Sequence, residues 1–311
     1  MAEIKVTLPD ESTRALPEGS TGADLAADVG RSLAKAAIAL NINGETKDLS
    51  KPLSDGDAVS VITPDTEDGL YVLRHSTAHV LAQAVLGIWE GATYAIGPPI
   101  KDGFYYDFEL PDGATFTEDD LINIEKRMRE IIKEDQHFER HEISSEEALE
   151  LFGKHKFKKE IIERVSTGEI DSEISNEASA EGTISYYQNG QDFVDLCTGP
   201  HVPATGKLGH FALQKVAGAY WRGDEKQPML QRIYGTAWAS KKDLEDYLER
   251  LAEAEKRDHR RLAAELDLVS WPEDLGPGLA VWHPKGSLIR KVIEDYSRTR
   301  HENGGYNFVF S

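Results

Sequence analysis

Two short stretches, far apart in the chain, hold the side chains that could do chemistry. His75 and His79 have three residues between them, and so do Cys197 and His201. On a helix this spacing places two side chains on one face, one turn apart. Imidazoles and a thiol that converge can hold a metal ion or handle protons. The sequence therefore predicts one compact polar site to which both stretches contribute.

Different elements must position the two pairs. Apolar residues recur at helical spacing between residues 78 and 89, which predicts a helix around the first pair. The second pair encloses Gly199-Pro200, a dipeptide that helix interiors reject. A hairpin with its turn at Asn189-Gly190 precedes it. We therefore expect Cys197 at the end of a strand and His201 in the loop that follows.

Size and composition limit the class of protein. A chain of 311 residues is too long for one ordinary compact domain, so about two or three domains are expected. No apolar run is long enough to span a bilayer and the first residues lack a secretory signal, so we expect no membrane association and a cytoplasmic location. The single cysteine excludes an internal disulfide. The formal charge of −20 argues against strong non-specific attraction to nucleic acid.

The order of patterns predicts an α+β protein of four segments. Residues 1–63 combine short strands with one helix that extends to about Leu33, and a polar linker follows. Residues 70–240 form a larger α+β unit that contains both pairs. Residues 241–268 read as one long charged helix that connects domains. Residues 269–311 hold an amphipathic helix and end in what reads as a strand near Phe308, where we expect an exposed edge.

The four paired side chains allow three interpretations. A lone histidine is usually a structural group and a buried cysteine is unremarkable, but two pairs of equal spacing favour a common site. The second interpretation is zinc, because histidine and cysteine are good tetrahedral ligands. The third is metal-free proton chemistry, in which neutral imidazoles with a pKa near ~6.5 position and deprotonate water. Residue types alone do not separate the last two.

Longer motifs resemble known families. Asn43-Gly-Glu-Thr-Lys-Asp-Leu49 and Leu53-Ser-Asp-Gly-Asp57 resemble the TGS domain, a ubiquitin-like β-grasp module, whose task here stays open between a spacer and RNA binding. Six further motifs, taken together and in this order, resemble bacterial-type threonyl-tRNA synthetase. They are His75-Ser-Thr-Ala-His79, Gly97-Pro-Pro-Ile-Lys-Asp-Gly-Phe-Tyr-Tyr-Asp107, Asp195-Leu-Cys-Thr-Gly-Pro-His-Val-Pro203, Ala219-Tyr-Trp-Arg-Gly-Asp224, Leu230-Gln-Arg-Ile-Tyr-Gly-Thr-Ala237 and Trp282-His-Pro-Lys-Gly286.

This resemblance implies a substrate for the polar site. In that family the second domain is an editing site that hydrolyses serine wrongly attached to threonine tRNA. Serine lacks only the methyl group of threonine, and a difference of one methylene changes binding by only ~1 to 3 kcal/mol. A second, smaller hydrolytic site is therefore useful. The implied substrate is the ester that joins serine to the terminal adenosine of the tRNA.

The resemblance also implies roles for individual residues. His75 or Lys158 would orient or deprotonate the attacking water, although Lys159 is adjacent and competes for the second assignment. Asp195 would bind the serine amine or hydroxyl. The groups that shape the pocket and hold the ester would be His79, Cys197 and His201.

Cofactors and partners follow from the same resemblance. Similar editing domains mostly work without zinc, so we expect no metal; bound zinc would take His75, His79, Cys197 and His201 as ligands. Whole enzymes of the family use ATP, magnesium and a zinc in a class II catalytic core, of which residues 278–311 resemble only the beginning. We therefore expect a truncated piece that edits but does not aminoacylate. Its partner would be the acceptor end of tRNA(Thr). The family forms homodimers, and this piece can be a monomer.

Two other functions are compatible with parts of the sequence. One is a free-standing trans-editing deacylase, but such a protein has no reason to carry the beginning of a synthetase core at Gly278 to Ser311. The other is a module that binds tRNA or a protein partner and has no activity, which predicts no deacylation at all.

Overall fold

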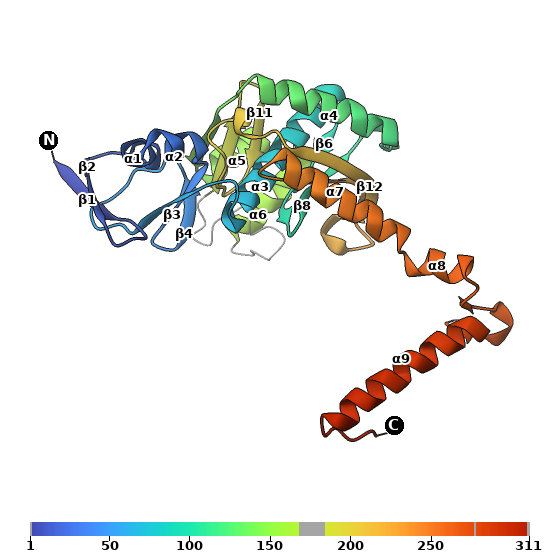
Figure 1. The fold of residues 1–311 in the computed structure, drawn as a ribbon. Helices are drawn as coiled ribbons and strands as arrows, with labels where there is room; N and C mark the ends of the chain where they lie inside the picture. Colours follow the sequence, from blue (N-terminus) through green and yellow to red (C-terminus); the bar gives the residue numbers. More distant parts are fainter. Residues whose placement is uncertain (1, 168–183, 277, 310–311) are drawn as a thin grey trace. The chain divides into compact units, whose positions relative to one another are not determined.

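The structure is a computed structural model that describes residues 2–167, 184–276 and 278–309. It consists of two compact units that divide between Leu244 and Glu245. Figure 1 labels their elements along the chain. The first unit contains a small β-rich domain followed by a larger α+β domain, and both domains contribute to the site described below.

The small domain has two antiparallel sheets around its own core of leucine, isoleucine and valine side chains. Strand β1 pairs with β2, and the second sheet has the order β4-β3-β5. The elements are β1 (Glu3–Thr7), β2 (Thr13–Pro17), α1 (Gly22–Val29), α2 (Arg31–Ala36), β3 (Ala39–Ile42), β4 (Glu45–Asp48) and β5 (Val59–Ile62). The prediction of one helix to about Leu33 is wrong, because the extended backbone of Gly30 separates α1 from α2. Strand β4, which has no apolar alternation, is absent from the prediction.

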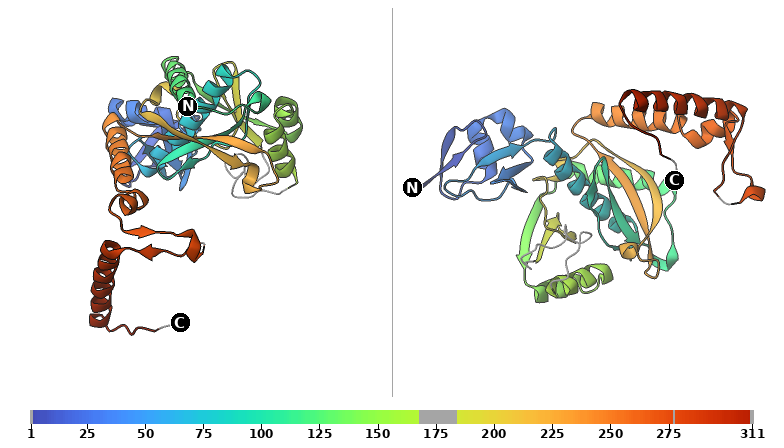
Figure 2. Two further views of the ribbon diagram at one scale, coloured as in Figure 1. Left: turned by 90° about the vertical axis from the view of Figure 1, so that its right-hand side faces the viewer. Right: turned by 90° about the horizontal axis from the view of Figure 1, so that it is seen from below.

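The larger domain is built on a five-stranded antiparallel sheet in the order β12-β13-β8-β6, with β7 paired to β8. Two helices, α3 and α4, pack against this sheet (Figure 2) and enclose the main hydrophobic core with it. Both helices begin at threonine caps, Thr66 and Thr117, and the second is the predicted capping box with Asp120. The elements are α3 (Glu67–Ile88), β6 (Thr93–Tyr94), β7 (Pro99–Ile100), β8 (Gly103–Glu109), α4 (Glu118–Lys133), β12 (Phe211–Tyr220) and β13 (Met229–Ala237).

A second, three-stranded sheet in this domain has the order β11-β10-β9. Its apolar side chains share a smaller core with helices α5 and α6. The predicted hairpin with its turn at Asn189-Gly190 is confirmed as β10 and β11. The elements are β9 (Phe138–Ile143), α5 (Ser145–Phe152), α6 (Lys156–Ser166), β10 (Ile184–Asn189) and β11 (Phe193–Leu196).

The last part of the chain differs from the prediction in two places. The expected single helix over residues 241–268 is two helices, because Asp258 leaves the helical path and caps α8 by accepting a hydrogen bond from the Arg260 N–H at 2.8 Å. Residues 306–309 are not in a strand, since no described segment offers them a ladder of backbone partners. The elements are α7 (Lys241–Lys256), α8 (His259–Glu265), β14 (Val269–Ser270), β15 (Val281–Trp282) and α9 (Pro284–Asn303).

Candidate active site

Helix α3 carries the first pair of histidines on a face that points into the protein. His75 and His79 are both buried, and their ring centroids lie 5.3 Å apart. The spacing of one helical turn therefore brings the two imidazoles together, as predicted. Arg74, next to them, is held by the backbone carbonyls of Ala237 and Lys101, which fixes the helix against the main sheet.

The β10–β11 hairpin delivers the second pair. Strand β11 ends at Leu196, so Cys197 directly follows a strand and His201 lies in the loop, as predicted. The Ser185 hydroxyl donates a hydrogen bond to the Cys197 carbonyl at 2.7 Å and anchors the strand end. Gly199 turns the loop with φ of +76°, and a Cβ at this position would lie 2.0 Å from the Tyr187 hydroxyl oxygen. Only glycine fits this turn.

The four side chains meet, and they are called the His/Cys site below. The Cys197 sulfur lies 3.2 Å from Nε2 of His75 and 3.3 Å from Nε2 of His201. The ring centroid of His201 lies 4.2 Å from that of His79. One nitrogen or sulfur atom from each residue lies within 4.8 Å of the other three, and all four residues are buried. A convergence predicted from two distant motifs is therefore present in the fold.

A buried ion pair lies beside the His/Cys site. The Lys158 ammonium on α6 is 2.7 Å from one oxygen of Asp195. The other carboxylate oxygen accepts a hydrogen bond from the Tyr106 hydroxyl at 2.5 Å and is 3.5 Å from Nε2 of His79. Lys158 is fully buried, whereas half of the neighbouring Lys159 side chain is exposed. Of the two adjacent lysines, only Lys158 is in contact with the site.

Burial controls the protonation of these groups. It is the largest cause that lowers the pKa of His75, to about 4, and it lowers the pKa of His79 and His201 well below the ordinary value. The three imidazoles are therefore neutral at neutral pH. Burial also raises the pKa of Asp195, while Lys158 and the Tyr106 hydroxyl act in the opposite direction because they stabilise the carboxylate.

The tautomer of His201 follows from its contacts. Its Nδ1 is 3.1 Å from the Ser76 hydroxyl, which also donates to the Val72 carbonyl at 2.8 Å and accepts from the Val202 N–H at 3.0 Å. Because the hydroxyl has one proton and a carbonyl can only accept, the His201 Nδ1 carries the proton and donates. Its Nε2 is then unprotonated, and the lone pair of this nitrogen faces the Cys197 sulfur.

The donor set would also suit a metal ion. Three imidazole nitrogens and one thiolate are typical zinc ligands. Nδ1 of His79 has no hydrogen-bond partner among the described residues, while its Nε2 faces Asp195, an arrangement that often supports a metal-binding histidine. Zinc bound here would polarise a carbonyl or activate water. The expectation of a metal-free site stays a prediction.

Sequence reasoning missed several groups that contact the site. Tyr106 lies within one of the recognised motifs and Ser76 lies between the two histidines of another, so their positions in the motifs were a usable signal. The ring centroid of Tyr187 lies 4.4 Å from that of His201. For this residue the only sequence signal was its place in the predicted hairpin. Asp48 belongs to the other domain, and nothing in the sequence pattern connects it to the site.

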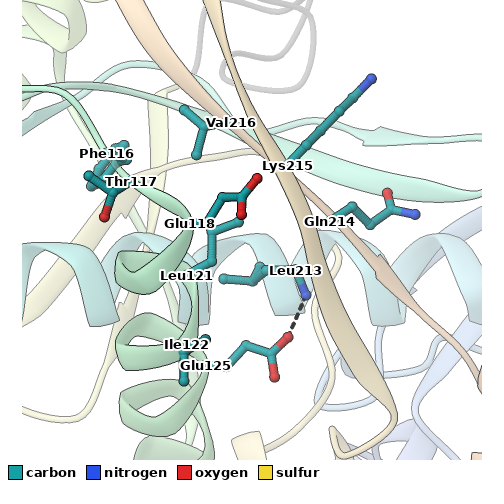
Figure 3. Close-up of a pocket in the computed structure, with 10 residues that line it drawn as sticks. All are labelled: Phe116, Thr117, Glu118, Leu121, Ile122, Glu125, Leu213, Gln214, Lys215 and Val216. Carbon is teal, nitrogen blue, oxygen red and sulfur yellow. Dashed lines mark hydrogen bonds between the residues drawn. The ribbon is translucent and has the colours of Figure 1, made fainter.

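Two cavities differ in their relation to the site. One of about 750 Å³ lies between the start of α4 and β12, where Glu125 accepts a hydrogen bond from the Leu213 N–H (Figure 3), and no predicted site residue lines it. Another of about 210 Å³ is lined by His201 together with Asp48 and Phe138. The smaller cavity is therefore the one that reaches the His/Cys site.

Two parts of the chain match known domain families. Residues 4–63 match the TGS domain family, and residues 184–234 match the family described as the threonyl and alanyl tRNA synthetase second additional domain. The second match contains three of the six predicted site residues, namely Asp195, Cys197 and His201. The match of residues 4–63 to the TGS family confirms the ubiquitin-like fold predicted for the first domain. None of the described helices has the length and apolar character that a membrane crossing requires.

The particular relatives are bacterial threonine–tRNA ligases. The ligase of Acidithiobacillus ferrooxidans is 51% identical over 308 residues, which is 98% of this chain and 45% of the relative. Those of Citrifermentans bemidjiense and Nitrosococcus oceani are 48% and 50% identical over 99% and 98% of the chain, and 46% and 45% of their own lengths are covered. The chain thus spans slightly less than half of these relatives. The matches confirm the resemblance to bacterial-type threonyl-tRNA synthetase that the motifs predict.

Proposed function

We propose that this chain is the proofreading part of a threonine–tRNA ligase and hydrolyses the ester of serine wrongly attached to tRNA(Thr). The observation that carries the proposal is the buried meeting of the four groups of the His/Cys site beside the Lys158–Asp195 pair. Ester hydrolysis needs a group that orients or deprotonates water and groups that hold the acyl part. This cluster contains both kinds.

His75 is the better-supported candidate for the group that orients or deprotonates the water. Its pKa, lowered to about 4 mainly by burial, leaves the ring unprotonated at neutral pH. The Lys158 ammonium, in contact with Asp195 at 2.7 Å, has no free lone pair while it stays charged. Lys158 then stabilises negative charge near Asp195, and His75 interacts with the water.

Asp195 recognises the serine in this proposal, through its amine or its hydroxyl. A carboxylate held by Lys158 and Tyr106 keeps a fixed orientation, which favours a charge-assisted hydrogen bond to the ammonium of an aminoacyl ester. His79, Cys197 and His201 shape the walls of the pocket. A pocket that admits the serine hydroxymethyl group but has no room for another methyl group rejects threonine.

The remaining properties of the whole enzyme belong to the same proposal. The ligase reaction, with ATP, magnesium and a core zinc, would need a class II catalytic core, of which residues 269–311 would form the beginning. The proposed domains are residues 1–63, the editing domain at 70–240 and a helical connection from 241 to 268. The partner is the acceptor end of tRNA(Thr), the compartment is the cytoplasm, and the whole enzyme is a homodimer.

A deacylation assay tests the proposal. The chain should release serine from seryl-tRNA(Thr) much faster than threonine from threonyl-tRNA(Thr). His75→Ala should lower the rate by about 100-fold or more, the usual contribution of a positioned acid or base, and Cys197→Ala should lower it less. His210→Ala, an exposed histidine outside the site, is the matched control and should keep the wild-type rate. Equal release of both amino acids, or no release, would contradict the proposal; no release would favour the binding-module alternative.

A further inference from the structure

Asp48, at the end of β4 in the TGS domain, reaches across to the editing domain. One oxygen of its carboxylate accepts a hydrogen bond from the backbone N–H of His201 at 2.9 Å. The other accepts one from the Tyr187 hydroxyl at 2.6 Å. A single side chain of the first domain therefore holds two separate segments of the second, the β10 strand and the loop after β11.

Both segments belong to the His/Cys site. His201 supplies one of the four groups, and the Tyr187 ring packs edge-on against its imidazole at 4.4 Å. On another side the Phe138 ring stacks on the same imidazole at 4.9 Å. The Tyr187 hydroxyl occupies the space that a side chain at residue 199 would need. The position of Tyr187 therefore fixes the course of the loop that carries His201.

We infer that Asp48 is a positioning residue: the TGS domain uses its carboxylate to hold His201 in place within the His/Cys site. Burial raises the pKa of Asp48, while the hydrogen bonds from the Tyr187 hydroxyl and the His201 N–H act in the opposite direction because they stabilise the carboxylate. The loss of the carboxylate would leave a buried tyrosine hydroxyl and a backbone N–H without a partner. The loop could then move, and the contact of 3.3 Å between His201 and Cys197 would loosen. The importance of this for catalysis rests on the proposed function, but the positioning itself does not.

The single cysteine of the chain gives a readout that needs no tRNA. Cys197 is buried, so a thiol reagent such as dithionitrobenzoate reacts only when the surrounding loop opens. Asp48→Ala in the full chain should speed the labelling of Cys197 by about tenfold, as expected when the two hydrogen bonds to this carboxylate no longer oppose the opening. Asp48→Asn should restore the rate to within about threefold of wild type, because the amide oxygen can accept from His201 and the amide N–H₂ can donate to the tyrosine oxygen.

A matched control separates positioning from general docking of the two domains. The Lys207 ammonium donates a hydrogen bond to the Lys35 carbonyl at 2.6 Å, a contact between the same two domains that does not involve the His/Cys site. Lys207→Ala should leave the labelling rate unchanged. Equal acceleration in Lys207→Ala and Asp48→Ala would overturn the inference, and so would a wild-type labelling rate in Asp48→Ala.

A second variant covers the case in which Asp48→Ala does not fold. Tyr187→Phe removes one of the two donors to the carboxylate but keeps the aromatic ring, and it should accelerate labelling by about threefold, because the backbone N–H of His201 still donates to Asp48. A folded Tyr187→Phe with unchanged labelling would count against the inference.

With seryl-tRNA(Thr), Asp48→Ala should lower kcat while KM stays close to wild type. If the wild type shows no deacylation, the proposed function fails, whereas the labelling series still decides whether Asp48 positions the loop.

Discussion

At the scale of single residues, the site depends on keeping buried polar groups neutral or paired. The three imidazoles lie in the interior, and the Asp195 carboxylate beside them is paired with Lys158. A buried imidazole that must stay neutral resists protonation, while the same histidine in the unfolded chain titrates near ~6.5. The folded and unfolded states therefore bind different numbers of protons in mildly acidic solution.

This difference predicts a pH-dependent stability. The pKa of His75 is lowered to about 4, so between that value and the ordinary one the unfolded chain binds a proton that the folded chain does not. Stability from this source is complete above the unfolded pKa and is lost as the pH falls. At pH 5 the contribution lost from His75 alone is about 2 kcal/mol relative to pH 7.5.

Urea unfolding at both pH values measures the effect. His75→Gln has no imidazole at this position, so its loss of unfolding free energy between pH 7.5 and pH 5 should be smaller than that of wild type by about 2 kcal/mol. The same pH dependence in both proteins would show that His75 is not held neutral by burial.

At the scale of elements, one helix and one hairpin account for five of the six predicted site residues. Helix α3 supplies His75 and His79 by its own periodicity, and the hairpin supplies Asp195, Cys197 and the loop with His201. The sixth, Lys158, comes from α6, which has a buried apolar face but no capping side chain at its start. The loop after β11, which carries Cys197 and His201, depends on the positive φ of Gly199 for its turn.

Gly199→Ala should therefore destabilise the protein. Its φ of +76° is unfavourable for alanine, and the new Cβ would lie 2.0 Å from the Tyr187 hydroxyl. We expect a loss of about 2 to 5 kcal/mol in the free energy of unfolding, from backbone strain and overpacking together. Gly209→Ala is the matched control, because nothing lies within 4 Å of the Cβ there, and it should change stability by less than about 0.5 kcal/mol. Similar midpoints for both variants in urea unfolding would contradict the steric argument.

At the scale of the whole molecule, charge and domain order matter most. The chain carries a formal charge of −20, yet its proposed partner is a polyanion. Affinity for tRNA must then come from a few local contacts, since the overall field repels phosphates. The TGS domain contacts the His/Cys site through Asp48.

The net charge predicts weak non-specific binding. An unrelated RNA duplex should bind this chain with a dissociation constant above about 10⁻⁴ M at physiological salt, because tighter non-specific binding requires the release of counterions by clustered lysine and arginine. Fluorescence anisotropy with a labelled duplex measures this, with tRNA(Thr) as the comparison. Micromolar binding of the unrelated duplex would show that a basic surface outweighs the total charge.

The features that could be predicted from the sequence are local ones. The period of apolar residues predicted α3, the Asn189-Gly190 turn predicted the β10–β11 hairpin, and Thr117 with Asp120 predicted the start of α4. Motifs long enough to be specific predicted the relatives. Each of these signals lies within a few residues of the feature that it specifies.

Contacts between distant segments could be identified only from the folded structure. It distinguished Lys158 from Lys159 by burying one and exposing the other. It divided the predicted helix of residues 241–268 at Asp258. It also brought Asp48 from the TGS domain to the backbone of His201, a pair separated by 153 positions. Packing chooses such contacts from many side chains of the same type, and no local spacing encodes that choice.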